Sequence, residues 1–84
     1  MRLPRDLSGR DLARVLAAYG YSITRQTGSH LRLTTLAGGE HHITIPDHAA
    51  LRVGTLASVL ADVAAHVGRT REAVIRELFG AADH

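Results

Sequence analysis

The chain is 84 residues long, 45% hydrophobic and free of cysteine, which excludes a second large domain, disulfides, a thiol nucleophile and cysteine-ligated zinc. Its apolar runs are too short to cross a membrane or to serve as a secretion signal, so we expect one cytoplasmic domain over residues 1–84. The formal net charge is only +2, but all ten cations are arginine, whose planar guanidinium suits phosphates and carboxylates.

The arginines are concentrated towards the N-terminus. Six of the ten lie within the first 32 residues: Arg2, Arg5, Arg10, Arg14, Arg25 and Arg32. A GC-rich genome would also explain arginine in place of lysine, but the clustering favours a polyanion or an acidic protein as partner.

The first segment with helical periodicity begins at Ser8. Ser8 is a good N-cap, Asp11 stands at the N3 position, and Gly20 is suited to end the helix. Apolar residues recur between them at helical spacing: Leu12, Val15, Leu16 and Tyr19. We therefore expect a helix here, with Arg10 and Arg14 one turn apart on its exposed face.

From Tyr21 the period of the apolar residues changes to two. Residues 21–27, 30–34 and 42–45 alternate apolar with polar side chains, glycine-containing turns separate these runs, and Pro46 closes the last. Alternation of this kind predicts a three-stranded antiparallel sheet with one face buried.

The alternation also predicts which residues lie opposite each other, because residues paired across antiparallel strands share a face. Centring the first hairpin on Gly28 gives three pairs: Ile23 with Leu33, Arg25 with Leu31, and Gln26 with His30. The second hairpin has two allowed registers, which set Arg32 and Thr34 beside Thr44 and either His42 or Pro46. Both registers predict the same exposed polar face: Ser22, Thr24, Gln26, His30, Arg32, Thr34, His42 and Thr44.

Two further helices are predicted after the Pro46-Asp47-His48 turn. The first has an apolar stripe between a Thr55 cap and Gly68: Leu56, Val59, Leu60, Val63 and Val67. Thr70 caps a shorter helix with four apolar residues: Val74, Ile75, Leu78 and Phe79. The order of elements predicts an α+β fold of two layers, in which the helices cover one face of the antiparallel sheet.

His30 is the first candidate for chemistry. It lies at the start of a strand on the exposed polar face, and imidazole exchanges protons near neutral pH. Gly28 lets a substrate backbone approach, Ser29 offers a hydroxyl donor, and Arg25 and Arg32 lie near enough to contact a phosphate. This set suits cleavage of RNA through its own 2′-hydroxyl, which needs no metal. By spacing alone, an ordinary exposed histidine is the alternative.

Three other histidines, His41, His42 and His48, raise the alternative of a metal site. His41 and His42 are adjacent on a strand, so their side chains point to opposite faces, and no carboxylate or cysteine stands at a ligand-like spacing. We therefore expect a polar turn region with no metal and no small-molecule cofactor. One of the two registers brings His48 close to His30, where it would serve as a second proton-transfer group.

The segment from Ala64 to Val74 has the spacing of a DNA-reading helix-turn-helix, with Gly68 at the turn. The helix that would enter the groove also carries Glu72 and Glu77, whose negative charge would face phosphate. DNA binding is therefore a lesser alternative.

Several short motifs follow one another along nearly the whole chain, from Leu3 to about Leu78. They are Leu3-Pro4-Arg5, Ser8-Gly9-Arg10-Asp11, Arg25-Gln26-Thr27-Gly28-Ser29-His30, Ile45-Pro46-Asp47-His48 and Gly54-Thr55-Leu56. Together they resemble the HicA family, the toxin halves of bacterial type II toxin–antitoxin pairs. The Gly-Ser-His step and the later Pro-x-His and Gly-Thr-Leu run are specific in combination, whereas either alone is weak.

The resemblance implies a fold like that of double-stranded-RNA-binding domains and ribosome-independent cleavage of mRNA, with His30 as catalytic residue and Gly28 as the turn glycine. It also implies a HicB-type antitoxin that binds the toxin and covers the histidine. The family commonly has Lys or Arg before Gly-Ser-His, where this chain has Thr27. That departure leaves Arg25 and Arg32 to contact phosphate.

The combined prediction is a metal-independent mRNA endoribonuclease toxin with His30 as general acid and base. Six residues are predicted to bind RNA or support catalysis: Gly28, Ser29, Arg25, Arg32, Arg10 and His48. The arginine-rich N-terminal end is expected to bind the RNA. mRNA and the antitoxin are the expected partners, without a membrane or a cofactor. The alternative is a binding module of the same fold, with RNA or protein partners but no catalytic turnover.

Overall fold

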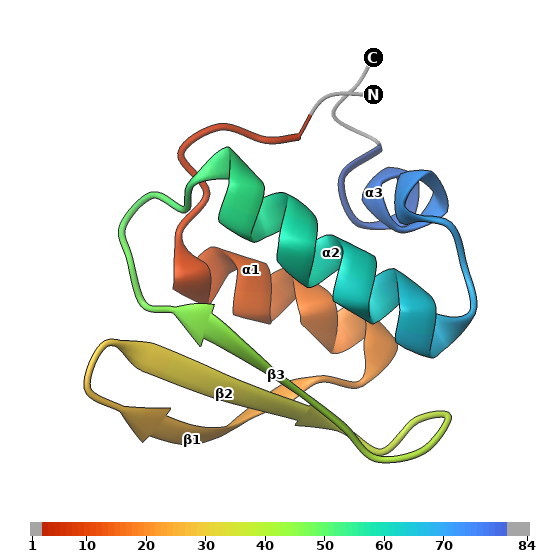
Figure 1. Cartoon of the computed structure of the whole chain (residues 1–84), viewed down its shortest axis with the longest axis horizontal. Coiled ribbons are helices and arrows are strands. Elements are labelled where there is room, and N and C mark those ends of the chain that lie inside the picture. Colours follow the sequence, from red (N-terminus) through yellow and green to blue (C-terminus); the bar gives the residue numbers. More distant parts are fainter. Residues whose placement is uncertain (1–2, 81–84) are drawn as a thin grey trace.

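A computed structural model of the chain, drawn in Figure 1, describes residues 3–80. The elements follow in the order α1 (Gly9–Val15), a 3₁₀ turn η1 (Leu16–Tyr19), β1 (Ser22–Thr27), β2 (His30–Thr35), β3 (His41–Pro46), α2 (Val53–Val67) and α3 (Arg71–Phe79). The predicted order of one helix, three strands and two helices is confirmed.

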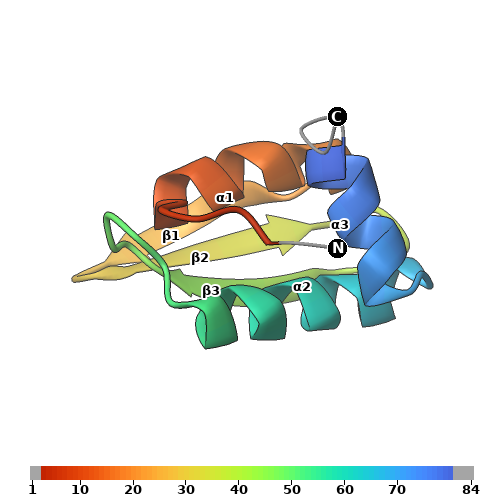
Figure 2. The ribbon, with the colours of Figure 1, turned by 90° about the horizontal axis from the view of Figure 1, so that it is seen from above.

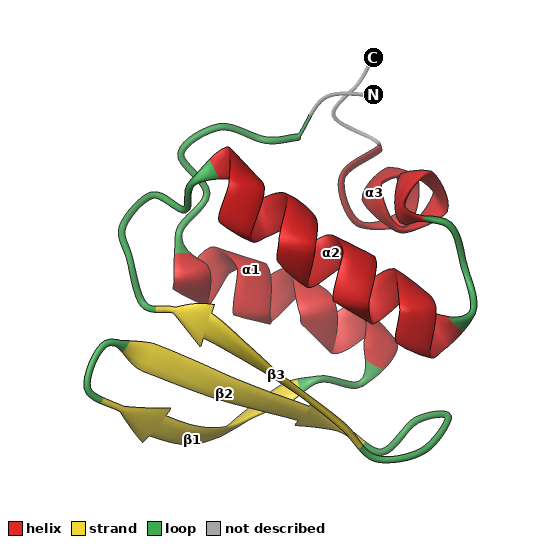
Figure 3. Cartoon of the chain, viewed as in Figure 1, coloured by secondary structure: helices red, strands yellow, loops and turns green. Residues whose placement is uncertain are grey.

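The sheet and the helices form two layers. The strands are antiparallel, in the order β1-β2-β3. Figure 1 shows the helices on one side of the sheet, and Figure 2, seen from above, shows α1 and α2 side by side over the strands, with α3 turned across their end. Within residues 3–80, no element covers the other face of the sheet, as the colouring by secondary structure in Figure 3 makes plain. The predicted α+β architecture with helices on one face is confirmed.

Alternation along the strands separates the two faces of the sheet. Leu31 and Leu33 of β2 and Ile45 of β3 have no exposed surface and belong to the core beneath the helices. The helices contribute further fully buried side chains: Leu12, Leu16, Leu56, Leu60, Val63 and Val74. Because side chains alternate along a strand, the polar residues between the buried ones point to the uncovered face.

The predicted helix ends at Ser8, Gly20, Gly68 and Thr70 are confirmed. The Ser8 hydroxyl accepts a hydrogen bond from the third helical N–H at 2.9 Å, and the Thr70 hydroxyl does the same for α3 at 3.0 Å. These local signals were readable because a cap involves residues only three positions apart.

The predicted cap of α2 at Thr55 is wrong. The Leu56 N–H already donates to the Arg52 carbonyl at 2.9 Å, so the helix begins at Val53 and Arg52 is the N-cap residue. Arg52 makes no side-chain capping bond. Thr55 therefore lies inside the first turn, and the sequence preference for a hydroxyl at the cap was overridden by the longer helix.

The first hairpin turns more tightly than predicted. Two residues, Gly28 and Ser29, form the turn, and Gly28 has a φ of 56°. Glycine with positive φ at the first of two turn residues is typical of type II′ hairpins. Centring the hairpin on Gly28 assumed a turn of three residues, so the predicted pairs next to the turn are displaced by one residue.

The register of β1 and β2 corrects two of the three predicted pairs. Arg25 lies opposite Arg32, not Leu31, and Gln26 lies opposite Leu31, not His30. His30 pairs with Thr27 instead. A β-bulge between Ile23 and Arg25 inserts one extra residue, which restores the predicted pair of Ile23 with Leu33. The bulge thus moves Arg25 onto the uncovered face and removes Gln26 from it.

The second hairpin adopts one of the two registers that the alternation allowed. Arg32 lies opposite Thr44 and Thr34 lies opposite His42. At the other end of the strand pair, His30 lies opposite Pro46. The register in which His48 would lie opposite His30 is therefore not the one that the chain adopts.

Candidate active site

His30 begins β2, directly after the Gly28–Ser29 turn at one end of the sheet. Its neighbour Leu31 is fully buried under the helices, so the His30 side chain points to the uncovered face, where it is exposed. Thr27 flanks it on β1 and Pro46 on β3. The predicted position of His30, at a strand start on a polar face beside a glycine turn, is confirmed.

The His30 imidazole makes no hydrogen bond or ion pair with any residue in the described range 3–80. In contrast, His41, His42 and His66 each use ring nitrogens to bind a neighbour at 2.7 to 3.3 Å. An exposed imidazole without a protein partner is accessible to a substrate for proton transfer. Among these four histidines, His30 is thus the one that is available for proton transfer.

Arg25 and Arg32 accompany His30 on the same face. Because Arg25 lies opposite Arg32 in the register, the two side chains project from neighbouring strands on one side of the sheet. Both residues are exposed, and neither forms an ion pair with a carboxylate within residues 3–80. Arg32 is two residues from His30 along β2, so its Cα lies about 7 Å from that of His30. Two cations and one imidazole therefore share a small area.

Arg10, which the sequence predicts to contact RNA, is half exposed and has a carboxylate partner in the fold. Its guanidinium forms an ion pair of 3.1 Å with Asp47, and the Asp47 N–H donates to the Ser29 carbonyl at 2.7 Å. Arg14 is likewise paired, with Asp11 at 3.0 Å. The two arginines of α1 thus have carboxylate partners, and Arg10 connects the helix to the segment that supports the Gly28–Ser29 turn.

Gly9 is a supporting residue whose role the sequence did not reveal. A Cβ at this position would overlap the Pro46 carbonyl oxygen, and the Gly9 N–H donates to the His48 carbonyl at 3.0 Å. The first turn of α1 is therefore in direct contact with the end of β3 at Pro46, the residue that lies opposite His30. The Ser8-Gly9-Arg10-Asp11 motif marked the position, but helix capping gave no reason for a glycine there.

His48 follows the end of β3 and is exposed. Its backbone carbonyl binds Gly9, while Pro46, two residues earlier, takes the position opposite His30. A role for His48 as a second proton-transfer group thus has no support from the register. Gly28 is open to approach, because a Cβ added there would meet nothing within 4 Å.

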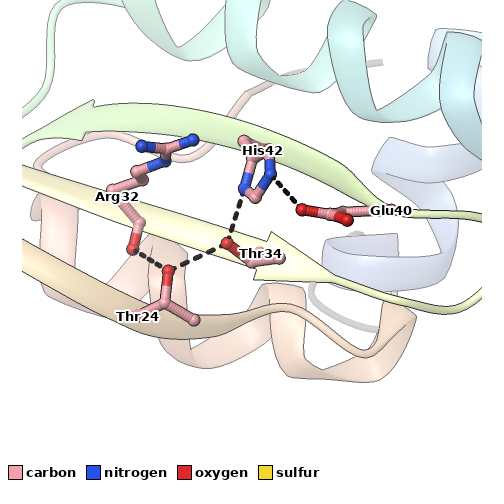
Figure 4. A network of polar contacts seen from close by, with 5 residues as sticks. All are labelled: Thr24, Arg32, Thr34, Glu40 and His42. Atoms are coloured by element: carbon pink, nitrogen blue, oxygen red, sulfur yellow. Dashed lines mark hydrogen bonds and ion pairs between the residues drawn. The ribbon is translucent and has the colours of Figure 1, made fainter.

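The rest of the uncovered face is occupied by a chain of polar contacts, shown in Figure 4. The Thr24 and Thr34 hydroxyl oxygens are 2.8 Å apart, and the Thr34 oxygen is 2.7 Å from Nδ1 of His42. Nε2 of His42 is 2.7 Å from a Glu40 carboxylate oxygen. Since the carboxylate accepts, Nε2 of His42 donates this hydrogen bond. Figure 4 shows the Arg32 guanidinium on this same face with no contact drawn to it.

A second group of histidines lies at the opposite end of the sheet. The Tyr21 hydroxyl is 2.7 Å from Nδ1 of His41, and Nε2 of His41 is 3.3 Å from Asp62 on α2. The His41 ring stacks on His66 with centroids 4.4 Å apart, and Nε2 of His66 donates to the Ala37 carbonyl at 3.0 Å. Burial, together with the nearby Asp62 charge, raises the pKa of the Tyr21 hydroxyl. These groups satisfy one another and fasten the β2–β3 hairpin to α2.

Sequence reasoning missed this second cluster. The sequence predicts His41 to lie in a polar turn region and gives no role to His66, because the partners of both residues are 20 or more positions away. Within residues 3–80, no group of three or more His, Cys, Asp or Glu side chains could hold a metal ion. A pocket of about 410 Å³ opens beside His66, between η1, the β2–β3 hairpin and the end of α2. It lies at the end of the sheet away from His30.

The third helix carries two arginines and two glutamates, so its charges balance. Val74 and Ile75 are buried against the core, and Glu77 accepts from the Tyr19 hydroxyl and pairs with Arg69 at 3.2 Å.

No helix in the described part of the chain is both long and apolar enough to cross a membrane.

Residues 9–64 match the family described as the HicA toxin of bacterial toxin–antitoxin systems. The chain belongs to the HicA toxin family. The matched range includes α1, the whole sheet and most of α2, and thus all residues around His30. No curated protein and no solved structure gives a significant match to the chain. Membership of the HicA family places the chain among the toxins of toxin–antitoxin pairs, which implies an antitoxin as partner.

Proposed function

We propose that this HicA family member is an mRNA endoribonuclease in which His30 transfers the protons of the reaction. The observation that carries the proposal is the exposed His30 imidazole without a protein partner in residues 3–80, two residues from Arg32 and on the same face as Arg25. Three of the other histidines are engaged in hydrogen bonds. An acid–base group beside two phosphate-binding cations suits a reaction at a phosphodiester.

In the proposed reaction His30 takes the proton from a ribose 2′-hydroxyl, and the 2′ oxygen attacks the adjacent phosphorus. The bond to the 5′ oxygen of the next nucleotide breaks, and the imidazolium returns its proton to that oxygen. The products are a 2′,3′-cyclic phosphate and a 5′-hydroxyl end. Arg25 and Arg32 stabilise the charge that develops on the phosphate oxygens. Gly28 and Ser29 leave room for the strand and supply a hydroxyl donor at the turn.

The partner in this proposal is a HicB-type antitoxin that binds over His30 in the cytoplasm, where mRNA is found. Support comes from the family membership and from the uncovered sheet face, where exposed cations and polar side chains surround the histidine. A protein that buries this face would block access of RNA to His30. An acidic surface on the antitoxin would match Arg25 and Arg32.

The test is the His30→Ala variant, compared with His42→Ala. His42 is also exposed and lies on the same face, but it is held by Thr34 and Glu40. We expect His30→Ala to lower the rate of cleavage of purified RNA by roughly 10²- to 10⁴-fold and to stop growth arrest on induction. His42→Ala should retain both activities, and cyclic-phosphate ends should appear in excess EDTA. Undiminished cleavage by His30→Ala would refute the assignment, and RNA binding without cleavage by the parent would favour the binding-module alternative.

A further inference from the structure

The pair formed by Arg25 and Arg32 is an unusual feature of the uncovered face, because like charges directly across a sheet repel each other. From this pair we infer that RNA crosses the uncovered face of the sheet with its phosphates held between Arg25 and Arg32, and that it is bound through its backbone, with little selection of bases. The inference rests on the proposed ribonuclease function and specifies how the substrate of that site is held.

The backbone is arranged so that both guanidiniums reach this face. With a two-residue turn, Arg25 falls opposite Arg32, and a regular continuation of β1 would then turn Ile23 outwards. The bulge between Ile23 and Arg25 absorbs one residue, so that Ile23 returns to the side of Leu33 while Arg25 stays beside Arg32. Ile23 thus lies on the same side of the sheet as Leu33, although it stays 43% exposed, and the two cations lie on the uncovered side.

Arg5, Arg52 and Arg76 also have no ion pair within residues 3–80, so what distinguishes Arg25 and Arg32 is that two unpaired arginines lie directly opposite each other. Four arginines outside the pair have a carboxylate within 4.0 Å: Arg10, Arg14, Arg69 and Arg71. Arg25 and Arg32 have no such partner within residues 3–80, although they are the two that face each other. An anion between them would remove their repulsion, and a phosphate accepts from two guanidiniums at once. Because Arg32 is two residues from His30 along β2, a phosphate held by Arg32 places the next phosphodiester of the RNA beside the His30 imidazole.

The face offers no aromatic platform for bases. The chain has only three aromatic residues apart from histidine, and all lie elsewhere: Tyr21 is buried, Tyr19 is in η1 and Phe79 is on α3. Proteins that bind single-stranded RNA tightly usually stack bases on such side chains. Without them, affinity must come from phosphate contacts, which depend steeply on salt and are shared by all sequences.

The experiment measures RNA binding by the full chain carrying His30→Ala, so that the RNA is not cut. Fluorescence anisotropy with labelled oligo(U), oligo(A) and mixed-sequence RNA is recorded between about 50 mM and about 200 mM salt. Arg25→Gln and Arg32→Gln are each expected to weaken binding about tenfold and to lower the salt slope by about 0.7. The matched control is Arg76→Gln on α3, another exposed arginine, which should change the dissociation constant less than twofold. The three RNAs should bind within about threefold of one another.

A thermal unfolding measurement at low salt provides an independent readout. Because Arg25→Gln and Arg32→Gln each remove one of two repelling charges, both should raise the unfolding midpoint of the free protein, which also shows that they fold. Unchanged RNA binding in both variants, equal weakening by Arg76→Gln, or absence of RNA binding by the parent overturns the inference. Arginine-dependent binding by a parent that does not cleave RNA would support the inference while refuting the proposed nuclease.

Discussion

The two ends of the sheet use histidine in opposite ways. At the hairpin end, His41 and His66 stack on each other and bind Tyr21, Asp62 and the Ala37 carbonyl. At the turn end, His30 has no protein partner in the described range 3–80. The histidines that hold the β2–β3 hairpin to α2 have bonded ring nitrogens, whereas His30 has no protein partner in this range and is accessible to a substrate.

The turn end is nevertheless not loosely built. Its backbone is held from three sides: Gly9 contacts Pro46, the Asp47 N–H binds the Ser29 carbonyl, and the Gly9 N–H binds the His48 carbonyl. At the turn end the His30 side chain has no partner within residues 3–80 while the backbone is fixed, whereas at the hairpin end the histidine side chains themselves are held by hydrogen bonds. A reactive group benefits from this arrangement, because its position is defined while its ring remains accessible.

The largest expected effect on stability comes from filling the contact beneath the turn end. Gly9→Ala would place a methyl group against the backbone of Pro46, so we expect a loss of about 3 kcal/mol in the free energy of unfolding. Cleavage should fall as well, since Pro46 flanks His30. Urea unfolding measures the loss. The control is Gly54→Ala in α2, where a Cβ meets nothing within 4 Å and stability should stay the same or rise slightly. Equal stability of the two variants would contradict the close contact.

A smaller loss of stability is expected from a substitution at the hairpin end of the sheet. His41→Ala leaves the buried Tyr21 hydroxyl without its partner and removes the contact with Asp62. We therefore expect the free energy of unfolding to fall by about 2 kcal/mol. RNA cleavage per folded molecule should be unchanged, in contrast to His30→Ala, which should lose cleavage and retain its unfolding midpoint. Adding Tyr21→Phe to His41→Ala should recover part of the loss, because no unpaired hydroxyl is then buried. A folded His41→Ala protein without cleavage would break the comparison between the two ends.

The smallest effect concerns alkaline pH. Burial, with the hydrogen bond to Glu77, raises the pKa of Tyr19 from 10.0 to about 12. Because the folded-state pKa lies above the unfolded-state value, this contribution to stability is complete below pH 10 and is lost as the pH rises towards 12. Unfolding midpoints measured from pH 9 to pH 12 should therefore fall less steeply for Tyr19→Phe than for the parent. The pKa of Tyr21 is also raised, so its ionisation lowers the unfolding midpoint with rising pH in both proteins, and some pH dependence remains in Tyr19→Phe. Identical slopes would show that Tyr19 ionises alike in both states.

Much of the fold followed from local patterns in the sequence. The Ser8 and Thr70 caps, the Gly20 and Gly68 helix ends, and the alternation in β2 and β3 involve neighbours a few residues apart, and the structure has all of them. The alternation predicted for β1 is wrong in part, because this strand is exposed along its length and contains a bulge. Features that depend on distant partners were not readable. The contacts of His41 and His66 join residues 20 to 29 positions apart.

The candidate site was predicted in part. The exposed position of His30 followed from alternation, since a strand residue next to a buried leucine faces outwards. The pairing of Arg25 was wrong, because a two-residue turn and a bulge alter the register without leaving a clear mark in composition. The ion pair of Arg10 with Asp47 was not readable from the sequence, because the two residues are 37 positions apart, and contact of Arg10 with RNA stays a prediction.

The bulge near Thr24 also bears on how the protein behaves at high concentration. β1 is an edge strand, and an unbroken edge offers a row of free backbone groups to which another chain can add. An extra residue in the middle of this edge, followed by a charged arginine, interrupts that row. The other edge, β3, ends in Pro46, which has no N–H to donate. The same irregularity that sets the two arginines side by side therefore protects the sheet from growing into an aggregate.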